Sequence, residues 1–214
     1  MIDYLKEKYN AFSIFPYGST VYKNKKPEDQ DFIIVSDKNY FQESFEINGI
    51  KYEISNYNKE QFFKLINDHE IAVLECIKIN HSSKYVNKEI EDFILDFKIV
   101  KEQLRESISA KSSNSYVKAK KKLIIEEDFN VNISLKSLWH SFRMLDFGIQ
   151  IVKNNEIDPT SSNELYEKIV KDYLLNNNDW DKIHSKYKPE YNSLLSKFKE
   201  VCPKKKNSLN SSLK

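Results

Sequence analysis

Apolar residues follow two different spacings along this chain of 214 residues, and the spacing changes near residue 85. Before that point, short segments with alternating apolar and polar residues predict strands, because successive side chains of a strand point to opposite faces. Two such segments flank Asn48-Gly49, a pair typical of tight hairpins, and two further strands are predicted from apolar runs, one ending at Gly18 and one over residues 31–35. Helical spacing predicts three short helices in the same part, over residues 2–9, 59–68 and 71–79.

After residue 85 the strand signals fade, and apolar residues recur every three or four positions. This spacing predicts helices throughout, and the most apolar of them covers residues 135–152. A polar stretch at residues 110–115 predicts a break between two helices, and Pro189 predicts an interruption near the end of the chain. The second part of the chain is therefore expected to be all-helical.

These patterns predict an α+β protein built from two successive domains. A mixed-sheet domain is expected over residues 1–85 and a helical domain over residues 86–202. Residues 203–214 are rich in lysine, asparagine and serine, and a segment of this composition buries too little apolar surface to pack. We expect these last residues to form a mobile tail.

Candidate chemistry gathers in one stretch near the start of the chain. Gly18-Ser19 ends the first predicted strand, and after nine intervening residues Asp29-x-Asp31 runs into an apolar segment. Glycine permits a sharp turn, and a helical turn opened by Ser19 has free N–H groups that favour an anion. Asp29 and Asp31 are two residues apart, so on a strand their carboxylates share one face, with Cα atoms roughly 7 Å apart. The stretch predicts a site that holds divalent cations beside a phosphate.

The Gly18-Ser19 and Asp29-x-Asp31 pattern resembles that of the DNA polymerase beta-like nucleotidyltransferase superfamily. The chain departs from the commonest pattern at Glu28, where a serine is more usual, and at Glu53, where many relatives carry aspartate. Neither departure removes a metal-binding oxygen. Further segments look like the small predicted nucleotidyltransferases of bacteria and their phages, namely residues 52–65, 71–76, 135–145 and 155–157.

The resemblance implies an enzyme that moves a nucleoside monophosphate from a nucleoside triphosphate (NTP) to a hydroxyl and releases pyrophosphate. It implies that Asp29, Asp31 and Glu53 bind two metal ions, Mg²⁺ or Mn²⁺, and that Gly18 and Ser19 bind the phosphates. Alternation places Glu53 on the polar face of its strand, where an ordinary solvent-facing glutamate would also lie. A non-catalytic nucleotide- or RNA-binding module that kept the fold is the alternative from another class.

Three basic residues of the helical part are further candidates for nucleotide binding. Lys120 lies in a basic helix predicted over residues 116–126, either as a clamp on the triphosphate or as an exposed lysine. His140 and Arg143 are three residues apart, so they are neighbours on one ridge of an otherwise apolar helix. Because an unpaired buried charge is costly, they need either a triphosphate or an internal acidic partner.

Composition narrows the choice of partners only a little. The net charge of +2 does not by itself demand a nucleic acid, although the lysines at 118–122 and 204–206 weakly favour an RNA 3′ end as the acceptor. A protein hydroxyl or a small molecule stays open as the acceptor. Cys76 and Cys202 have no partner cysteines at metal-ligand spacing and are expected to be free thiols. Without an apolar run long enough to span a bilayer, we expect a cytoplasmic protein without a membrane partner.

Overall fold

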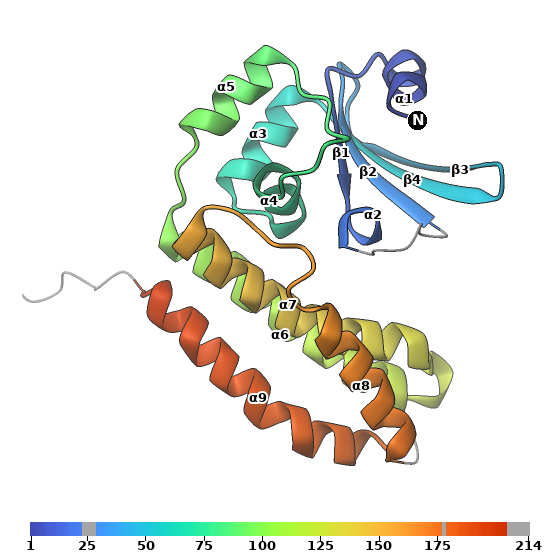
Figure 1. Cartoon of the computed structure of the whole chain (residues 1–214), viewed down its shortest axis with the longest axis vertical. Helices are drawn as coiled ribbons and strands as arrows, with labels where there is room; N and C mark the ends of the chain where they lie inside the picture. Colours follow the sequence, from blue (N-terminus) through green and yellow to red (C-terminus); the bar gives the residue numbers. More distant parts are fainter. Residues whose placement is uncertain (23–28, 177–178, 205–214) are drawn as a thin grey trace, which may run out of the picture.

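The computed structural model describes residues 1–22, 29–176 and 179–204, and it shows an α+β fold (Figure 1). The predicted fold class is confirmed: a mixed sheet comes first, and helices follow. In chain order the elements are α1 (Ile2–Tyr9), β1 (Ser13–Tyr17), α2 (Ser19–Tyr22), β2 (Asp29–Val35), β3 (Phe41–Ile47), β4 (Ile50–Tyr57), α3 (Lys59–Asn67), α4 (Ile71–Lys78), α5 (Lys88–Asp96), α6 (Lys101–Ile124), the 3-10 turn η1 (Glu126–Asp128), α7 (Val131–Asn154), α8 (Asn163–Leu175) and α9 (Trp180–Val201).

The four strands form one sheet in the order β1-β2-β4-β3. β1 and β3 are antiparallel to their neighbours, whereas β2 and β4 at the centre are parallel. The hairpin of β3 and β4 turns at Asn48 and Gly49, which have φ angles of 54° and 75°. Two successive residues with positive φ are what a type I′ turn requires, as the Asn-Gly pair predicted.

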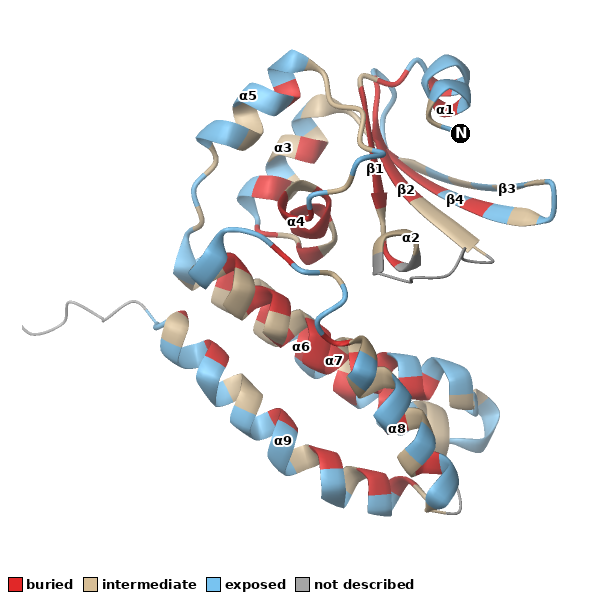
Figure 2. Ribbon diagram, in the orientation of Figure 1, coloured by how far each residue is buried: buried red, intermediate tan, exposed pale blue. Residues whose placement is uncertain are grey.

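Helices cover the two faces of the sheet unequally (Figure 2). On one face α1 packs Leu5 and Tyr9 against side chains such as Phe32 and Ile34. On the other face Phe62 of α3 joins a cluster of α3, α4 and α5 residues packed on alternate strand residues, among them Phe15, Ile33 and Val35. Along β2 burial therefore changes: Phe32 to Val35 are buried, whereas Asp29, Gln30 and Asp31 are partly exposed.

Helices α6, α7, α8 and α9 enclose a second core, and α4 belongs to both parts. Ile71 and Leu74 of α4 pack into the helical cluster, whereas Val73 and Cys76 pack toward the sheet. Helix α5 contributes Ile90 to the sheet-side cluster, so its packing is with the first part of the chain. The division into domains at residues 85 and 86 stays a prediction.

Two expected interruptions of helices are wrong. Residues 110–115 continue α6 without a break, because polar side chains find partners there: Ser112 is buried, its hydroxyl donates to the Ser141 carbonyl at 2.7 Å and lies 3.0 Å from the Tyr191 hydroxyl. Pro189 lies inside α9, which runs on through it. The helical spacing of apolar residues between positions 89 and 108 does not show the division between α5 and α6 that the structure has there.

The remaining expectations about the whole chain concern thiols, membranes and the tail. Cys76 and Cys202 are both free, as predicted, and both are buried. None of the described helices is long and apolar enough to cross a membrane. Residues 205–214, most of the expected tail, lie outside the described residues.

Candidate active site

A row of polar side chains crosses the sheet at the point where the helices cease to cover it. In the strand register Tyr17 of β1 lies opposite Asp31 of β2, Asp31 opposite Glu53 of β4, and Glu53 opposite Ser44 of β3. Residues paired in this way across a sheet point to the same face. The next row places Asp29 opposite Lys51 on that same face. The three predicted carboxylates are therefore neighbours on one face of the sheet.

The turn at Gly18 fixes α2 against β2. Gly18 is buried with a φ of 59°, a left-handed conformation that glycine adopts without strain. The hydroxyl of Thr20 in α2 accepts a hydrogen bond from the backbone N–H of Asp31 at 2.8 Å. Ser19 begins α2, and its side chain lies outside the part that the structure describes. A hydrogen bond from the Asp31 backbone to Thr20 thus connects the strand of Asp29 and Asp31 to the helical turn that follows Gly18.

Lys51, which the sequence analysis did not single out, lies among the carboxylates. Its ammonium forms an ion pair with Glu53, and both side chains are about half exposed. The hydrogen bond to Glu53 and the charge of that carboxylate raise the pKa of Lys51, and the charges of Asp29 and Asp31 act in the same direction. The sequence does contain a signal for this pair. Lys51 stands two residues before Glu53 on one predicted strand, and alternation places both side chains on the same face.

The fit of this face to metal ions is partial. Carboxylate oxygens are the hard ligands that Mg²⁺ and Mn²⁺ prefer, and the register supplies three of them on one face. Within the described ranges, however, no three metal-binding side chains gather closely enough to hold an ion as they lie. Glu53 is instead bonded to Lys51. The donor set fits a divalent cation, provided that Glu53 exchanges its lysine partner for the metal.

Tyr17 is a second residue that the sequence analysis missed. It is partly buried at the end of β1, near Asp31 and Ser55. Burial raises the pKa of its phenol, and the charge of Asp31 raises it further, so the hydroxyl stays protonated and can donate. The signal was available, because Phe15 and Tyr17 alternate with Pro16 and Tyr17 comes directly before Gly18.

Arg143 lies in the interior and pairs with an internal carboxylate. It is 3% exposed, its guanidinium contacts Glu75 of α4 at 3.3 Å, and it lies over the rings of Trp139 and Phe147. Burial raises the pKa of Glu75, and the positive charge of Arg143 opposes that shift. This is the internal acidic partner that the sequence analysis left open. A contact between Arg143 and a nucleotide stays a prediction, and it requires that pair to open.

His140 and Lys120 lie on the same helical pair in different settings. His140 is partly buried beside Trp139, and its pKa is well below the usual value because of burial, with Arg143, Lys136 and Lys118 adding repulsion. Its imidazole is therefore neutral at neutral pH. Lys120 is exposed on α6. Val21 of α2 packs against the helical core, so the helical part adjoins the phosphate turn. Nucleotide binding by His140 and Lys120 stays a prediction.

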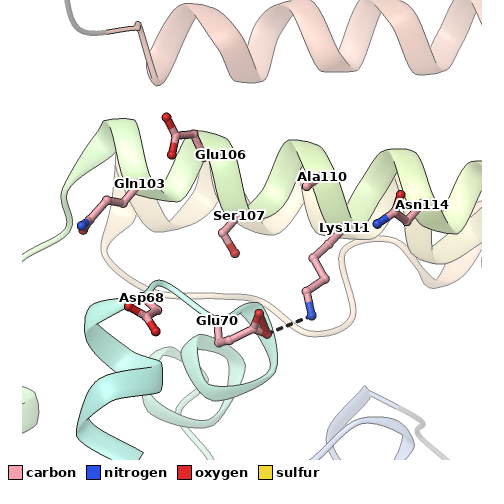
Figure 3. A pocket seen from close by; sticks show the side chains of 8 residues that line it. All are labelled: Asp68, Glu70, Gln103, Glu106, Ser107, Ala110, Lys111 and Asn114. Carbon is pink, nitrogen blue, oxygen red and sulfur yellow. Dashed lines mark ion pairs between the residues drawn. The ribbon is translucent and has the colours of Figure 1, made fainter.

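Two larger hollows, each about 450 Å³ in volume, are not lined by Asp29, Asp31 or Glu53. One separates the corner between α3 and α4 from α6, and an ion pair of 3.0 Å between Lys111 and Glu70 crosses it (Figure 3). The other is lined by residues such as His69 and Phe97 at the same junction. A smaller hollow of about 280 Å³ adjoins Glu53 on the face with the carboxylates. Size alone therefore does not identify the site.

Comparisons with known proteins add little. No protein-family profile matches the sequence. A search of curated proteins finds no match either. Among solved structures, the chain is similar to a nucleotidyltransferase-like protein from Exiguobacterium sibiricum 255-15, with a TM-score of 0.38 and 9% identity, over 93% of this chain and 76% of that one. A likeness this distant does not bear on function, so the functional conclusion depends on the site itself.

Proposed function

We infer that this protein is a metal-dependent nucleotidyltransferase that moves a nucleoside monophosphate from an NTP to a hydroxyl. The observation that supports this function is the register of β2 and β4, which aligns Glu53 with Asp31 and keeps Asp29 on the same face. A buried glycine turn joined to β2 through Thr20 lies beside them. Carboxylates next to a phosphate-sized turn are suited to phosphoryl-type transfer, in which positioning and charge neutralisation supply most of the rate.

The residues divide the work between binding and transfer. Asp29, Asp31 and Glu53 would hold Mg²⁺ or Mn²⁺, which when bound supply positive charge to the triphosphate and lower the pKa of a hydroxyl. The turn at Gly18 and Ser19 positions the phosphates. The acceptor oxygen forms a bond to the α-phosphorus, the bond from that phosphorus to the bridging oxygen breaks, and pyrophosphate leaves with the electron pair. The hydroxyl proton passes to Glu53 and then to water.

A specific observation also favours the non-catalytic alternative. The ion pair between Lys51 and Glu53 occupies a carboxylate that catalysis needs. A module that binds nucleotides or RNA without turnover would keep this pair closed and would need no metal. Metal dependence of labelling therefore separates the two functions.

Transfer is tested by incubating the protein with each labelled NTP, Mg²⁺ and either total RNA or cell lysate. We expect Mg²⁺-dependent label in one acceptor fraction, and an RNA acceptor is weakly favoured over a protein. Asp31→Asn should abolish labelling, whereas Glu46→Gln should retain it, because Glu46 lies on the same face opposite Lys51 but outside the proposed set. NTP binding that is independent of metal and yields no labelled product would support the non-catalytic module instead.

A further inference from the structure

The sheet has one covered edge and one open edge. At the covered edge β1 contains Pro16, and Ile14 exchanges two backbone hydrogen bonds with Tyr85, of 2.7 and 3.0 Å. At the other edge β3 ends the strand order, so no strand of the described part of the chain pairs with its outer side. Figure 1 shows the hairpin of β3 and β4 extending away from helices α6 to α9. The outer side of β3, seven residues long, is therefore available to a further strand.

The Asn-Gly turn determines which backbone groups of β3 point outward. In a hairpin with a two-residue type I′ turn, the residues on either side of the turn exchange both backbone hydrogen bonds, and here these are Ile47 and Ile50. Pairs bonded in this way recur at every second residue of an antiparallel ladder. The N–H and C=O groups of Gln42, Ser44 and Glu46 therefore point away from β4, toward the open edge.

This edge is complementary to itself in one antiparallel register. With Ser44 opposite Ser44 of a second copy, all seven residues of β3 are paired, and Gln42 lies opposite Glu46 twice by symmetry. The amide of Gln42 can donate to that carboxylate. Glu43 then lies opposite Phe45, so no like charges face each other. Registers centred on Glu43 or Glu46 instead place two glutamates directly opposite, which is destabilising, and one centred on Phe45 leaves the first two residues of β3 opposite the turn.

The surroundings of this edge favour a protein partner. The charge of Glu43 is already balanced by an ion pair of 2.7 Å with Lys8 of α1. Two exposed aromatic side chains lie beside the strand: Tyr4 is 41% exposed with its ring 5.7 Å from that of Phe45, and Tyr40, 49% exposed, directly precedes β3. Tyrosine is enriched at protein interfaces. β3 has neither lysine nor proline, two residues that commonly protect an edge strand from pairing.

We propose that β3 pairs with β3 of a second copy of this chain, in the antiparallel register centred on Ser44. The two four-stranded sheets then form one sheet of eight strands around a twofold axis perpendicular to the sheet. Because such an axis keeps each face on its own side, both rows of carboxylates lie on the same face. Five strand spacings of about 4.8 Å place the two Asp31 residues about 24 Å apart at the backbone. This dimer goes beyond the proposed transferase activity and does not depend on it.

The dimer is expected to be reversible and dependent on concentration. Three outward residues in each copy give six backbone hydrogen bonds across the new strand pair. Stable interfaces typically bury about 1,200–2,000 Å² in total, and two short strands with their flanking side chains lie at the low end of that range or below it. Sedimentation velocity over a series of protein concentrations should therefore show monomer and dimer in exchange, with the dimer fraction increasing with concentration.

A thiol at the twofold axis tests the register. Paired Cα atoms of a hydrogen-bonded antiparallel pair are about 5.5 Å apart, within the range of a disulfide, so Ser44→Cys should give a linked dimer under mild oxidation. Glu46→Cys, on the same strand and face, is the matched control, because its two copies lie about 14 Å apart and cannot be bridged. Cys76 and Cys202 are buried and should not react in either variant.

Opposite charges at position 42 test the same register without a covalent link. Gln42→Lys places a cation opposite Glu46 at two symmetric points and should tighten the dimer, whereas Gln42→Glu places like charges there and should weaken it. Two cross-strand pairs of ordinary strength correspond to a change of about 2- to 30-fold in the dimer Kd in each direction. Thermal unfolding at low concentration, where the monomer predominates, checks that both variants fold.

The outcomes decide the proposal in either direction. Selective linking through Ser44→Cys, together with opposite shifts of Kd in the two variants of Gln42, supports it. A monomer at every concentration, equal linking in both cysteine variants or in neither, or a dimer with the same Kd in both variants of Gln42 overturns it. None of these measurements uses an NTP, so a failure of the proposed transferase activity leaves their result unchanged.

Discussion

The sheet face and helix α7 both carry candidate residues, and the two sets differ in their surroundings. On the sheet, Asp31 and Glu53 are paired in register and remain open to solvent. On α7, Arg143 is almost fully enclosed and pairs with Glu75, whereas its ridge neighbour His140 is partly buried beside Trp139. Alternation along a strand tells which face of the sheet a side chain lies on, and residues paired with it on neighbouring strands lie on the same face. A ridge on a helix does not specify what packs against it.

Replacing Arg143 is expected to have the largest effect on folding. Arg143→Ala leaves the Glu75 carboxylate buried without its partner, which typically costs about 3–5 kcal/mol. Chemical denaturation should show that loss in the free energy of unfolding, and calorimetry on the folded fraction tests separately whether Arg143 contributes to the Kd for an NTP. Glu75→Gln, which removes the other charge, should also destabilise the protein. A weaker NTP affinity with unchanged stability would place α7 in the substrate site after all.

Gly148 tests the tight packing of the helical part without touching the sheet. A Cβ atom at this position of α7 would lie 2.6 Å from a ring carbon of Phe198 and 2.8 Å from a methyl group of Ile108. Gly148→Ala therefore overpacks the contact between α6, α7 and α9, at a cost of about 1–3 kcal/mol. Thermal unfolding measures the loss, and Ser113→Ala at an exposed position of α6 is the control. An increase in melting temperature would show that these side chains move aside freely.

Lys51 tests whether the sheet face is poised for a cation. The Lys51 ammonium is ion-paired with Glu53 and would compete with a metal ion for that carboxylate. Lys51→Met should therefore raise the affinity for Mg²⁺ by about fivefold, which corresponds to the interaction of two unit charges at about 4 Å in water. Titration of Mg²⁺ followed by calorimetry gives that affinity. Lys64→Met removes an exposed ion pair on α3 and is the matched control. Weaker Mg²⁺ binding in the variant would mean that Lys51 supports the bound state.

The smallest expected effect is the dependence of stability on pH. His69 joins the corner between α3 and α4 to α6, because its Nε2 accepts a hydrogen bond from the Val100 N–H at 2.9 Å and its Nδ1 lies 2.8 Å from the Asn67 carbonyl. Burial lowers the pKa of His69, although Asn67 and Asp68 oppose the shift. The unfolded chain therefore binds the proton more readily than the folded one, so this stability is present above about pH 6.5 and is lost as the pH falls.

Unfolding measured between pH 7 and pH 5 checks this dependence. His69→Gln keeps a hydrogen-bond acceptor that does not titrate, so the decrease in stability over this range should become smaller. The low pKa of His140 gives a contribution of the same sign, so some dependence should remain in the variant. A decrease of the same size in His69→Gln would exclude the imidazole as a source.

The sequence predicted the sheet better than the surroundings of the helices, for a physical reason. The positions of Gly18, Asp29 and Asp31 follow from local turns and alternation, and the Asn48-Gly49 turn specifies its own hairpin. The break expected at residues 110–115 is wrong, because Ser112 bonds to residues of α7 and α9 that lie 29 and 79 positions away. Tyr17 was missed because the residues that matter to it, Asp31 and Ser55, lie on other strands. Lys51 was missed although its partner Glu53 is two residues away on the same strand. Local chemistry is visible in one segment, whereas partners distant in sequence are not.

Calorimetric titration of an NTP, with and without Mg²⁺, tests the proposed site most directly when applied to the original protein and Asp31→Asn. We expect tight binding only with Mg²⁺ in the original protein, loss of that metal dependence in Asp31→Asn, and retention in Glu46→Gln. Without Mg²⁺, Asp31→Asn should melt at the same or a slightly higher temperature, because repulsion from Asp29 is relieved. Binding that ignores both Mg²⁺ and the Asp31 substitution would contradict a metal-dependent nucleotidyltransferase on this face of the sheet.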